Sequence, residues 1–375
     1  SLGVTNGGDT NSSNIGGIIG INNGNMYSGY NESIVTGNDN VGGIIGTNER
    51  IYNENDKKWT TGTVENVVNA TSVTSEAADS ENIGGLVGTN IGSVTNGRNN
   101  GTITGNTNVG GLVGNNGEDA VLTDLVNAEA ADITGIINVG GIAGSNAGEI
   151  TTGNVNTDEE VNLINRGSIT GQQYVGGVAG SNSGTITNAN NDVELNVKDS
   201  TATGDDAAKY FGGIAGVNTG TIKKATNTAN VNADGASYVG GIVGQNNGKL
   251  EDMAGNSGNV TGKDFVGGVV GENNGNGNNH DPLDKVIASN TGTVIATNGG
   301  AGGIFAVNNA GVINSELTNN GVVIGNGTTG TGGIFGVNKG DISKTSLINK
   351  IDGQVIGISN VGGLIGVNSG TITGS

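Results

Sequence analysis

Apolar residues along this chain occur in short clusters, and each cluster is bounded by Gly or Asn. The segment 82–107, NIGGLVGTNIGSVTNGRNNGTITGNT, contains three such clusters, within 83–87, at Val94 and at Ile103. Clusters this short, separated by turn residues, are typical of β-strands and lack the spacing of an amphipathic helix. The segment therefore predicts three short strands joined by three corners.

The same unit is repeated along the chain, and a Gly-Gly pair marks each copy. Successive pairs are separated by 26 to 42 residues, which indicates one supersecondary unit per copy, with insertions of variable length. We predict an all-β fold, a right-handed parallel β-solenoid of about twelve triangular coils with three short strands each, forming a single domain over residues 1–375. The pairs begin at Gly16, Gly42, Gly84, Gly110, Gly140, Gly176, Gly212, Gly240, Gly267, Gly302, Gly332 and Gly362.

An Asn stands six residues after the first Gly of every pair. A side-chain amide offers both donors and acceptors, so Asn residues stacked one coil apart can bond head to tail along the axis. We predict a structural ladder, and we expect these residues to adopt the left-handed backbone of a tight corner. The ladder residues are Asn22, Asn48, Asn90, Asn116, Asn146, Asn182, Asn218, Asn246, Asn273, Asn308, Asn338 and Asn368.

A second column, two residues before each Gly pair, changes its residue type along the chain. It holds Asn in the first five copies and an aromatic residue in the next four, at Tyr174, Tyr210, Tyr238 and Phe265. Stacked rings stabilise a coil, which makes a structural role the simpler interpretation. If the column faces solvent, it would instead form an aromatic strip suited to a sugar chain. The sequence leaves both interpretations open.

Insertions between copies identify the expected surface loops. The first of them contains the only Trp of the chain, Trp59, together with Tyr52 and three cationic side chains. Aromatic and cationic residues are enriched where proteins make specific contacts, so Trp59 and Tyr52 are candidate contact residues. The four decorated loops are residues 49–62, 153–167, 188–200 and 273–285.

Composition argues against an ordinary enzyme. The chain has 75 Gly, 13% charged residues and no Cys, and its single His, His280, lies in a polar loop without a catalytic partner in the sequence. We therefore expect a protein that is not an enzyme and that uses no cofactor. The carboxylates at 158–160 and 205–206 leave Ca²⁺ as a weaker alternative, because they do not recur from copy to copy.

Net charge and hydropathy restrict the partners. A formal charge of −19 repels phosphate backbones and anionic lipid, so we expect no nucleic-acid partner. The sequence also lacks an apolar stretch long enough for a membrane span. The chain begins without Met and stops partway through a repeat. We expect it to be a segment of a longer chain or of a polymer that assembles end to end.

The phrases GLVG at 85–88 and 111–114, GLIG at 363–366 and GIIG at 17–20 and 43–46 resemble the GLUG motif. Repeats of this motif occur in large bacterial surface and secreted proteins, including adhesin-like exoproteins. The resemblance implies export and a bacterial, secreted or cell-surface setting. It transfers no catalytic residue, and Ala306 departs from the final Gly of the motif.

Together, these features predict an extracellular structural or adhesive protein without enzymatic activity. Its partners would be host, matrix or neighbouring subunits. A solenoid that binds or processes carbohydrate through the aromatic column is the alternative. Ice binding is a weaker one, suggested by outward Thr pairs such as Thr102 and Thr104.

Overall fold

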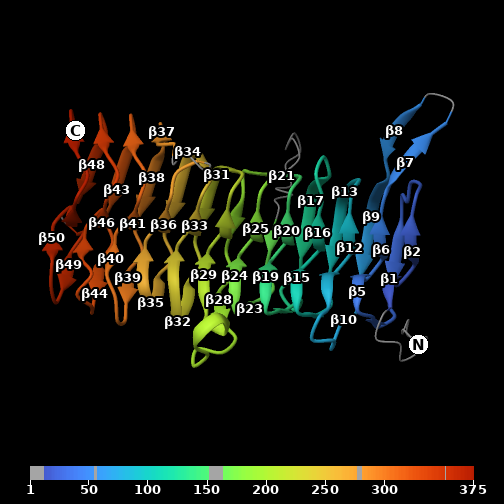
Figure 1. Cartoon of the computed structure of the whole chain (residues 1–375). Coiled ribbons are helices and arrows are strands. Elements are labelled where there is room, and N and C mark those ends of the chain that lie inside the picture. The colour runs from blue at the N-terminus through green and yellow to red at the C-terminus, as the bar shows by residue number, and fades with distance from the viewer. Residues whose placement is uncertain (1–11, 55–56, 152–163, 277–280, 351) are drawn as a thin grey trace. The chain divides into compact units, whose positions relative to one another are not determined.

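The computed structural model describes residues 12–54, 57–151, 164–276, 281–350 and 352–375. In these residues the chain is all-β, and its one short helical segment is the 3₁₀ turn η1 (Gly204–Asp206). The strands pair in parallel and form a β-solenoid of about 11 turns, which confirms the predicted fold class (Figure 1). Two compact units divide the chain: unit 1 contains residues up to 171 with 177–189, and unit 2 contains 172–176 with 190–375.

Unit 1 has three faces of parallel strands, here called A, B and C, and an antiparallel hairpin. Face A consists of β1 (Ser13–Gly16), β4 (Val35–Thr36), β5 (Asp39–Gly42), β10 (Val73–Thr74), β11 (Glu81–Gly84), β14 (Ile103–Thr104), β15 (Thr107–Gly110), β18 (Ile133–Thr134), β19 (Ile137–Gly140) and β23 (Ile169–Gly171). Face B consists of β2 (Ile19–Asn22), β6 (Ile45–Asn48), β12 (Val87–Asn90), β16 (Val113–Asn116), β20 (Ala143–Asn146) and β25 (Ala179–Asn182). Face C consists of β3 (Gly29–Asn31), β9 (Thr63–Asn69), β13 (Ser93–Asn99), β17 (Val121–Asn127), β21 (Glu149–Thr151), β22 (Ile164–Asn165) and β26 (Thr185–Thr187). The separate hairpin consists of β7 (Arg50–Asn53) and β8 (Lys58–Thr61).

Unit 2 repeats the three faces and adds a small fourth sheet. Face A consists of β24 (Gln173–Gly176), β28 (Leu195–Val197), β29 (Lys209–Gly212), β32 (Val231–Gly240), β35 (Val260–Gly267), β39 (Val294–Ala296), β40 (Ala301–Gly302), β44 (Val323–Gly325), β45 (Thr331–Gly332), β49 (Val355–Gly357) and β50 (Val361–Gly362). Face B consists of β30 (Ala215–Asn218), β33 (Val243–Asn246), β36 (Val270–Asn273), β41 (Phe305–Asn308), β46 (Phe335–Asn338) and β51 (Ile365–Asn368). Face C consists of β27 (Asn190–Asn191), β31 (Thr221–Asn227), β34 (Lys249–Asn256), β38 (Ile287–Asn290), β43 (Glu316–Asn319) and β48 (Ser346–Asn349). The fourth sheet consists of β37 (Leu283–Asp284), β42 (Val312–Ile313), β47 (Ile342–Ser343) and β52 (Ile372–Thr373).

The number of strands per turn differs from the prediction of three. The first apolar cluster of the unit is split by the Gly-Gly pair, so β11 ends at Gly84 on face A and β12 begins at Val87 on face B. The pair is therefore itself a corner. Most turns have four strands on three faces, and the last turns have a fifth, short strand from the fourth sheet.

The core is a set of apolar columns that run along the inside of each unit. The side chains of Ile83, Leu86, Val94 and Ile103, from the clusters that predicted the strands, are all fully buried. Each turn adds one member to each column, so the core grows with the number of turns and stays one side chain deep.

The predicted Asn ladder is present in both units. Asn90, which is fully buried, donates from Nδ2 to Oδ1 of Asn116 at 2.9 Å and to the carbonyl of Gly92 at 3.1 Å. Both amide hydrogens are therefore used inside the protein. The other bonds of the ladder, 2.7 to 2.9 Å long, are Asn22 to Asn48, Asn48 to Asn90, Asn116 to Asn146 and Asn146 to Asn182 in unit 1, and Asn218 to Asn246, Asn246 to Asn273, Asn273 to Asn308, Asn308 to Asn338 and Asn338 to Asn368 in unit 2.

The prediction that these Asn residues adopt a left-handed backbone is wrong. None of the described ladder residues has a positive φ. Left-handed residues occur instead in the column two positions before the Gly pair, for example Asn82 at φ 61°, and at other positions such as Asn96 and Lys224. The ladder position selects Asn for its hydrogen bonds alone, and the glycine after it is required for space. A Cβ on Gly92 would lie 2.1 Å from the carbonyl oxygen of Gly62.

A second buried Asn ladder lies at the end of the face C strands, and the sequence analysis missed it. Its residues follow the Gly pair at variable distances, because insertions lie between the two, so no fixed offset reveals them. Its bonds, 2.7 to 2.9 Å long, are Asn31 to Asn69, Asn69 to Asn99, Asn99 to Asn127 and Asn127 to Asn165 in unit 1, and Asn191 to Asn227, Asn227 to Asn256, Asn256 to Asn290, Asn290 to Asn319 and Asn319 to Asn349 in unit 2.

The second ladder explains the second glycine of each pair. A Cβ on Gly85 would lie 2.5 Å from Cγ of Asn99 and 2.1 Å from the carbonyl oxygen of Gly111 in the next turn. A side chain cannot occupy that space, because real Cβ atoms do not approach other atoms so closely. The Gly pair thus turns the corner and makes room for the ladder at the same time.

The expected surface loops have different outcomes. Residues 49–62 include the hairpin β7–β8, which projects from unit 1 (Figure 1). In 188–200, β27 and β28 belong to the coil, and the projecting segment of unit 2 follows them, between β28 and β29. Most of 153–167 and residues 277–280 of the fourth loop lie outside the described residues.

Replacing a central ladder residue, Asn116→Ala, is expected to lower the free energy of unfolding. The change removes the acceptor of the Asn90 amide nitrogen and the donor to Oδ1 of Asn146. Each buried group left unsatisfied costs about 1 to 3 kcal/mol. Chemical denaturation measures the effect. The matched control is the exposed Asn23→Ala, expected to change stability by less than about 0.5 kcal/mol. Equal stability of the two variants would contradict a structural ladder.

Gly85→Ala is expected to destabilise the fold by about 1 to 3 kcal/mol, because the new methyl group must displace the second ladder or the next turn. Gly255→Ala is the control, since a Cβ there meets nothing closer than 3.5 Å. The control should be neutral or stabilising, because Ala reduces the entropy of the unfolded chain. Thermal unfolding of both variants decides the matter, and a Gly85→Ala protein as stable as the control would be the contrary result.

Candidate functional site: an aromatic strip

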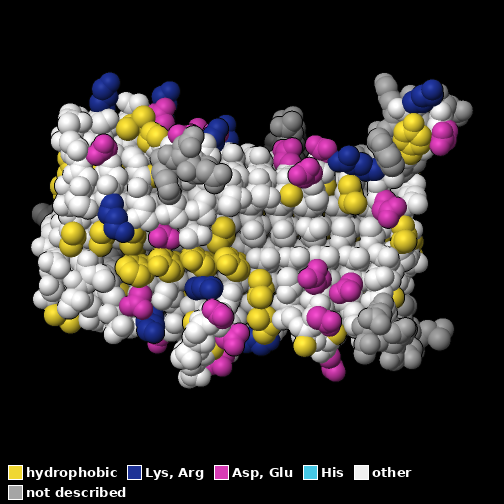
Figure 2. Space-filling model, in the orientation of Figure 1, with side chains coloured by type: hydrophobic (Ala, Val, Ile, Leu, Met, Phe, Trp, Pro, Cys, Tyr) yellow, Lys and Arg dark blue, Asp and Glu magenta, His cyan; other side chains and the backbone are white. Residues whose placement is uncertain are grey.

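The aromatic column forms a half-exposed strip at the corner between faces A and B of unit 2. Its members lie at the same position of β24, β29, β32 and β35, and each side chain is half-buried. Figure 2 shows a row of hydrophobic side chains over these strands. The aromatic column, which the sequence could place in solvent or in the core, is therefore partly exposed and partly buried. The strip consists of Tyr174, Tyr210, Tyr238 and Phe265.

The rings of the strip stack on one another along the axis. The ring centroids are 5.2 Å apart between Tyr174 and Tyr210, 5.3 Å between Tyr210 and Tyr238, and 5.0 Å between Tyr238 and Phe265. The planes of successive rings differ by only 10° to 16°. These centroid distances lie in the range typical of interacting aromatic pairs. The strip is a continuous aromatic surface with one ring per turn.

All four aromatic residues have a left-handed backbone, with φ between 55° and 62°. This conformation is rare for bulky residues and costs about 1 to 3 kcal/mol in general. The fold imposes it, because the third glycine of the following copy packs against the column. A Cβ on Gly216 would lie 2.4 Å from the carbonyl carbon of Tyr174, and one on Gly244 would lie 2.6 Å from that of Tyr210.

Unit 1 fills the same column with Asn, which tolerates the left-handed backbone better than an aromatic residue does. Asn108, for example, has φ 52° and donates from Nδ2 to Oδ1 of Asn82 at 2.8 Å. The corner can therefore be built without rings. The remaining bonds of this column are Asn40 to Asn14 at 3.2 Å, Asn82 to Asn40 at 2.9 Å and Asn138 to Asn108 at 2.8 Å.

Two rows of side chains flank the strip. The row on face A lies in the same strands as the rings, and the row on face B lies in the paired strands β30, β33, β36 and β41. The row on face A is Gln173, Lys209, Ser237 and Asp264, and the row on face B is Val217, Gln245, Glu272 and Val307.

A network of amides surrounds the carboxylate of Glu272 beside the strip. Gln245 donates from Nε2 to Oε2 of Glu272 at 2.8 Å, and Asn309 donates from Nδ2 to Oε1 at 3.1 Å. Asn309 also donates to Oδ1 of Asn274 at 2.8 Å, and Asn274 donates to Oδ1 of Asn247 at 2.9 Å. These bonds hold the polar side chains in fixed positions along face B.

Burial and the neighbouring carboxylate raise the pKa of two tyrosines. Burial is the main cause for Tyr210, and the charge of Glu272 and the adjacent tyrosines add to it, while a hydrogen bond with Gln245 acts in the opposite direction. The pKa of Tyr238 is raised by burial and then by Glu272 and Asp264. Both hydroxyl groups therefore stay protonated at neutral pH and can donate a hydrogen bond to a ligand.

The candidate contact residues of the hairpin lie in unit 1. Tyr52 is 41% exposed on β7 and pairs across the hairpin with Trp59 on β8. The side chain of Trp59 lies outside the described part of the structure. Arg50, at the base of the hairpin, forms an ion pair with Asp119 at 2.7 Å. The hairpin and the strip are thus separate candidates, and only the strip has a described side-chain arrangement.

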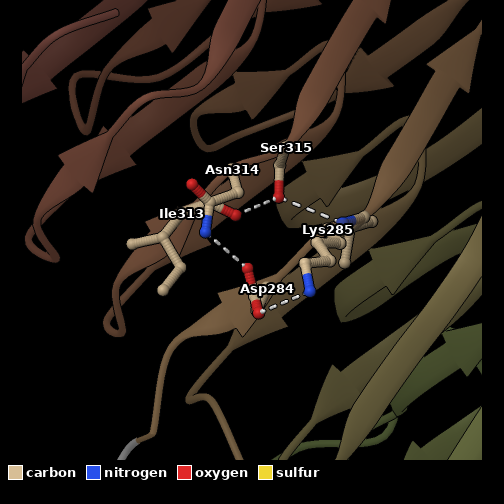
Figure 3. A network of polar contacts seen from close by, with 6 residues as sticks. Asp284, Lys285, Ile313, Asn314 and Ser315 are labelled. Carbon is tan, nitrogen blue, oxygen red and sulfur yellow. Dashed lines mark hydrogen bonds and ion pairs between the residues drawn. The ribbon is translucent and has the colours of Figure 1, made fainter.

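Other polar clusters of unit 2 are occupied by internal contacts. Figure 3 shows Asn314 donating to Oδ1 of Asp284 at 2.9 Å, while Ser315 donates to the carbonyl of Ile313 at 2.8 Å. Lys285 lies 4.0 Å from the carboxylate of Asp284. The bond between Asn314 and Asp284 joins two successive turns, whereas the other two contacts lie within a turn, and we assign all three a structural role.

The remaining carboxylate candidates give no metal centre in the described residues. Asp205 and Asp206 lie in η1, and their backbone carbonyls accept hydrogen bonds from Gln173 and Gln172. No group of three or more His, Cys, Asp or Glu side chains within the described ranges is arranged to hold a metal ion. Residues 158–160 and His280 lie outside those ranges.

Comparison of the chain with protein-family models, with curated proteins and with solved structures finds no match. The resemblance to GLUG repeats therefore stays a prediction. Among the residues that the structure describes, no helix combines the length and the apolar character that crossing a membrane requires.

Spectrophotometric titration of the tyrosines is expected to reveal at least two groups that ionise above the ordinary value of 10.0. Glu272→Gln should lower the pKa of both Tyr210 and Tyr238, because it removes a neighbouring negative charge. A Glu272→Gln protein in which both tyrosines ionise as they do in the wild type would contradict this cause.

The same shift predicts the direction of the pH dependence. A raised pKa means that the folded protein holds these protons when the unfolded chain has begun to lose them. Their contribution is complete below the unfolded value of 10.0 and is lost as the pH rises through the folded pKa. Unfolding free energies that increase above pH 10 would contradict this sign.

Proposed function

We propose that this chain is a structural and adhesive protein without enzymatic activity, secreted by a bacterium or held at its surface. The observation that carries the proposal is the use of the repeated polar side chains. In both buried Asn ladders the amides bond to one another and to the backbone, as Asn90 does with Asn116 and Gly92, and among the described ladder residues Oδ1 of Asn191 is the exception. The repeated residues therefore build a scaffold and leave no reactive group for chemistry.

Contacts would be made by features that vary from turn to turn. The aromatic strip of unit 2 and the projecting hairpin of unit 1 are such features. The solenoid framework supplies a regular support, since every turn presents one residue of each outward row. Export and a surface setting are supported by the resemblance to GLUG repeats.

The end turns support end-to-end association as the mode of assembly. Leu364, in the last turn of unit 2, is 40% exposed, whereas Ile334, at the same position one turn earlier, is fully buried. Ile18 in the first turn of unit 1 is 44% exposed, whereas Ile44 is fully buried. A further β-coil, from a neighbouring segment of a longer chain or from a second copy, would cover these core positions. We propose that the chain as given takes a second copy in this place.

Sedimentation velocity at increasing protein concentration tests the proposal. The chain should form concentration-dependent oligomers, and Leu364→Lys should weaken them because it places a charge at the apolar end. Met253→Lys is the matched control, since Met253 is 47% exposed but lies on the lateral face C. Circular dichroism checks that both variants fold. Monomers at all concentrations, or an equal effect of the two variants, would refute end-to-end assembly.

A further inference from the structure

We propose that the aromatic strip of unit 2 binds a neutral polysaccharide chain that lies along the solenoid axis. The proposed ligand gives the adhesive role its chemistry, and the inference does not depend on end-to-end assembly. It rests on the four stacked rings, on the polar side chains in the two flanking rows and on the charge around them.

The backbone of the strip indicates that the rings are there for a purpose beyond the fold. Unit 1 builds the same corner with Asn82 and Asn108, at no cost in aromatic strain. Stacking contributes about 0.5 to 1.5 kcal/mol per ring pair, which is comparable to the cost of a left-handed aromatic residue. Strained conformations that a protein retains are concentrated at binding sites.

The spacing of the rings fits a ligand with a short, regular repeat. Successive ring centroids are separated by 5.0 to 5.3 Å, close to the length of one glycosyl residue in an extended chain. Because each turn adds one ring, an extended glycan parallel to the axis meets the same environment at every sugar. A ligand across the axis would meet only one ring.

The chemistry of the strip matches the two kinds of surface on a sugar. The apolar C–H groups of a pyranose pack on aromatic side chains, and the half-exposed rings present their accessible parts along the row. The hydroxyl groups need donors and acceptors in fixed positions, and the hydroxyls of Tyr210 and Tyr238 provide both.

The polar network on face B supplies further anchored partners. Oε2 of Glu272 accepts amide hydrogen bonds from Gln245 and Asn274, while Oε1 accepts one from Asn309 and has a second lone pair for a sugar hydroxyl. On face A, Ser237 offers a hydroxyl along the opposite border of the strip. Pre-positioned groups of this kind reduce the entropic cost of binding.

The local charge selects a neutral glycan over an acidic one. Glu272 and Asp264 flank the strip, and Lys209 is the one cationic side chain in the two flanking rows. The whole chain carries a formal charge of −19. A polyanionic chain would meet like charges on both borders and in the overall field.

Isothermal titration calorimetry on the full chain tests the inference with defined probes. The neutral probes are cellohexaose, xylohexaose and mannohexaose, and the acidic probe is hexagalacturonic acid. At least one neutral hexamer should bind, and its affinity should increase from dimer to tetramer and then level off, because the strip has four rings. The acidic hexamer should bind at least about 10-fold more weakly than the neutral one.

Three variants locate the site. Tyr210→Asn places in the strip the residue that unit 1 uses in this column, and it should weaken binding at least about 10-fold without unfolding the protein. Tyr210→Phe keeps the ring and the stacking and should lose only the contribution of the hydroxyl, a smaller reduction. Tyr30→Asn, at a tyrosine that is 60% exposed outside the strip, should bind like the wild type.

Two outcomes would overturn the inference. One is that none of the three neutral hexamers binds at a concentration of about 5 mM, so that any Kd would lie above the millimolar range. The other is a Tyr210→Asn protein that binds like the wild type while circular dichroism shows it folded. Neither outcome affects the self-association measured by sedimentation, so the failure of this inference and that of the proposed assembly are distinguishable.

Discussion

The hydrogen bond from one buried Asn amide to the Asn of the next turn is the interaction on which the rest of the structure depends. Asn90 and Asn116 form it at 2.9 Å, and the same contact recurs through both units. An unpaired amide in this position would be costly, so each turn is forced into one register with its neighbours. The glycines follow from it, because Gly85 must leave room for Asn99. A thin core suffices because these bonds, and the parallel ladders beside them, fix every turn.

The sequence predicted what depends on a constant spacing. The first Asn ladder, the aromatic column and the parallel solenoid all follow from positions fixed relative to the Gly pair. The second ladder does not, because Asn69 and Asn165 are separated from their Gly pairs by insertions of different length. The backbone of the ladder was predicted wrongly because Asn serves two purposes here. In one column it supplies hydrogen bonds, and in another, at Asn82, it tolerates a left-handed corner. Composition cannot separate the two.

The candidate site could be predicted only in part. The sequence placed four aromatic residues in one column, but not their half-exposed position or their backbone conformation. Those depend on the corner that the third glycine creates, as Gly216 does against Tyr174. The network around Glu272 joins side chains from different turns and has no signature in the sequence. The Gly and Asn positions that the copies share thus build the scaffold, and the positions that vary between copies carry the proposed contacts.

The direction of the Asn bonds gives each ladder a polarity. In both buried ladders the amide nitrogen of the earlier turn donates to the oxygen of the later one, as Asn22 does to Asn48 and Asn31 to Asn69. Aligned amide dipoles strengthen one another along such a row. A turn added at either end continues the row only if its own amide points the same way. If two copies met through the same end, amide donors would face donors or oxygens would face oxygens. The ladders therefore permit head-to-tail stacking and disfavour head-to-head and tail-to-tail stacking.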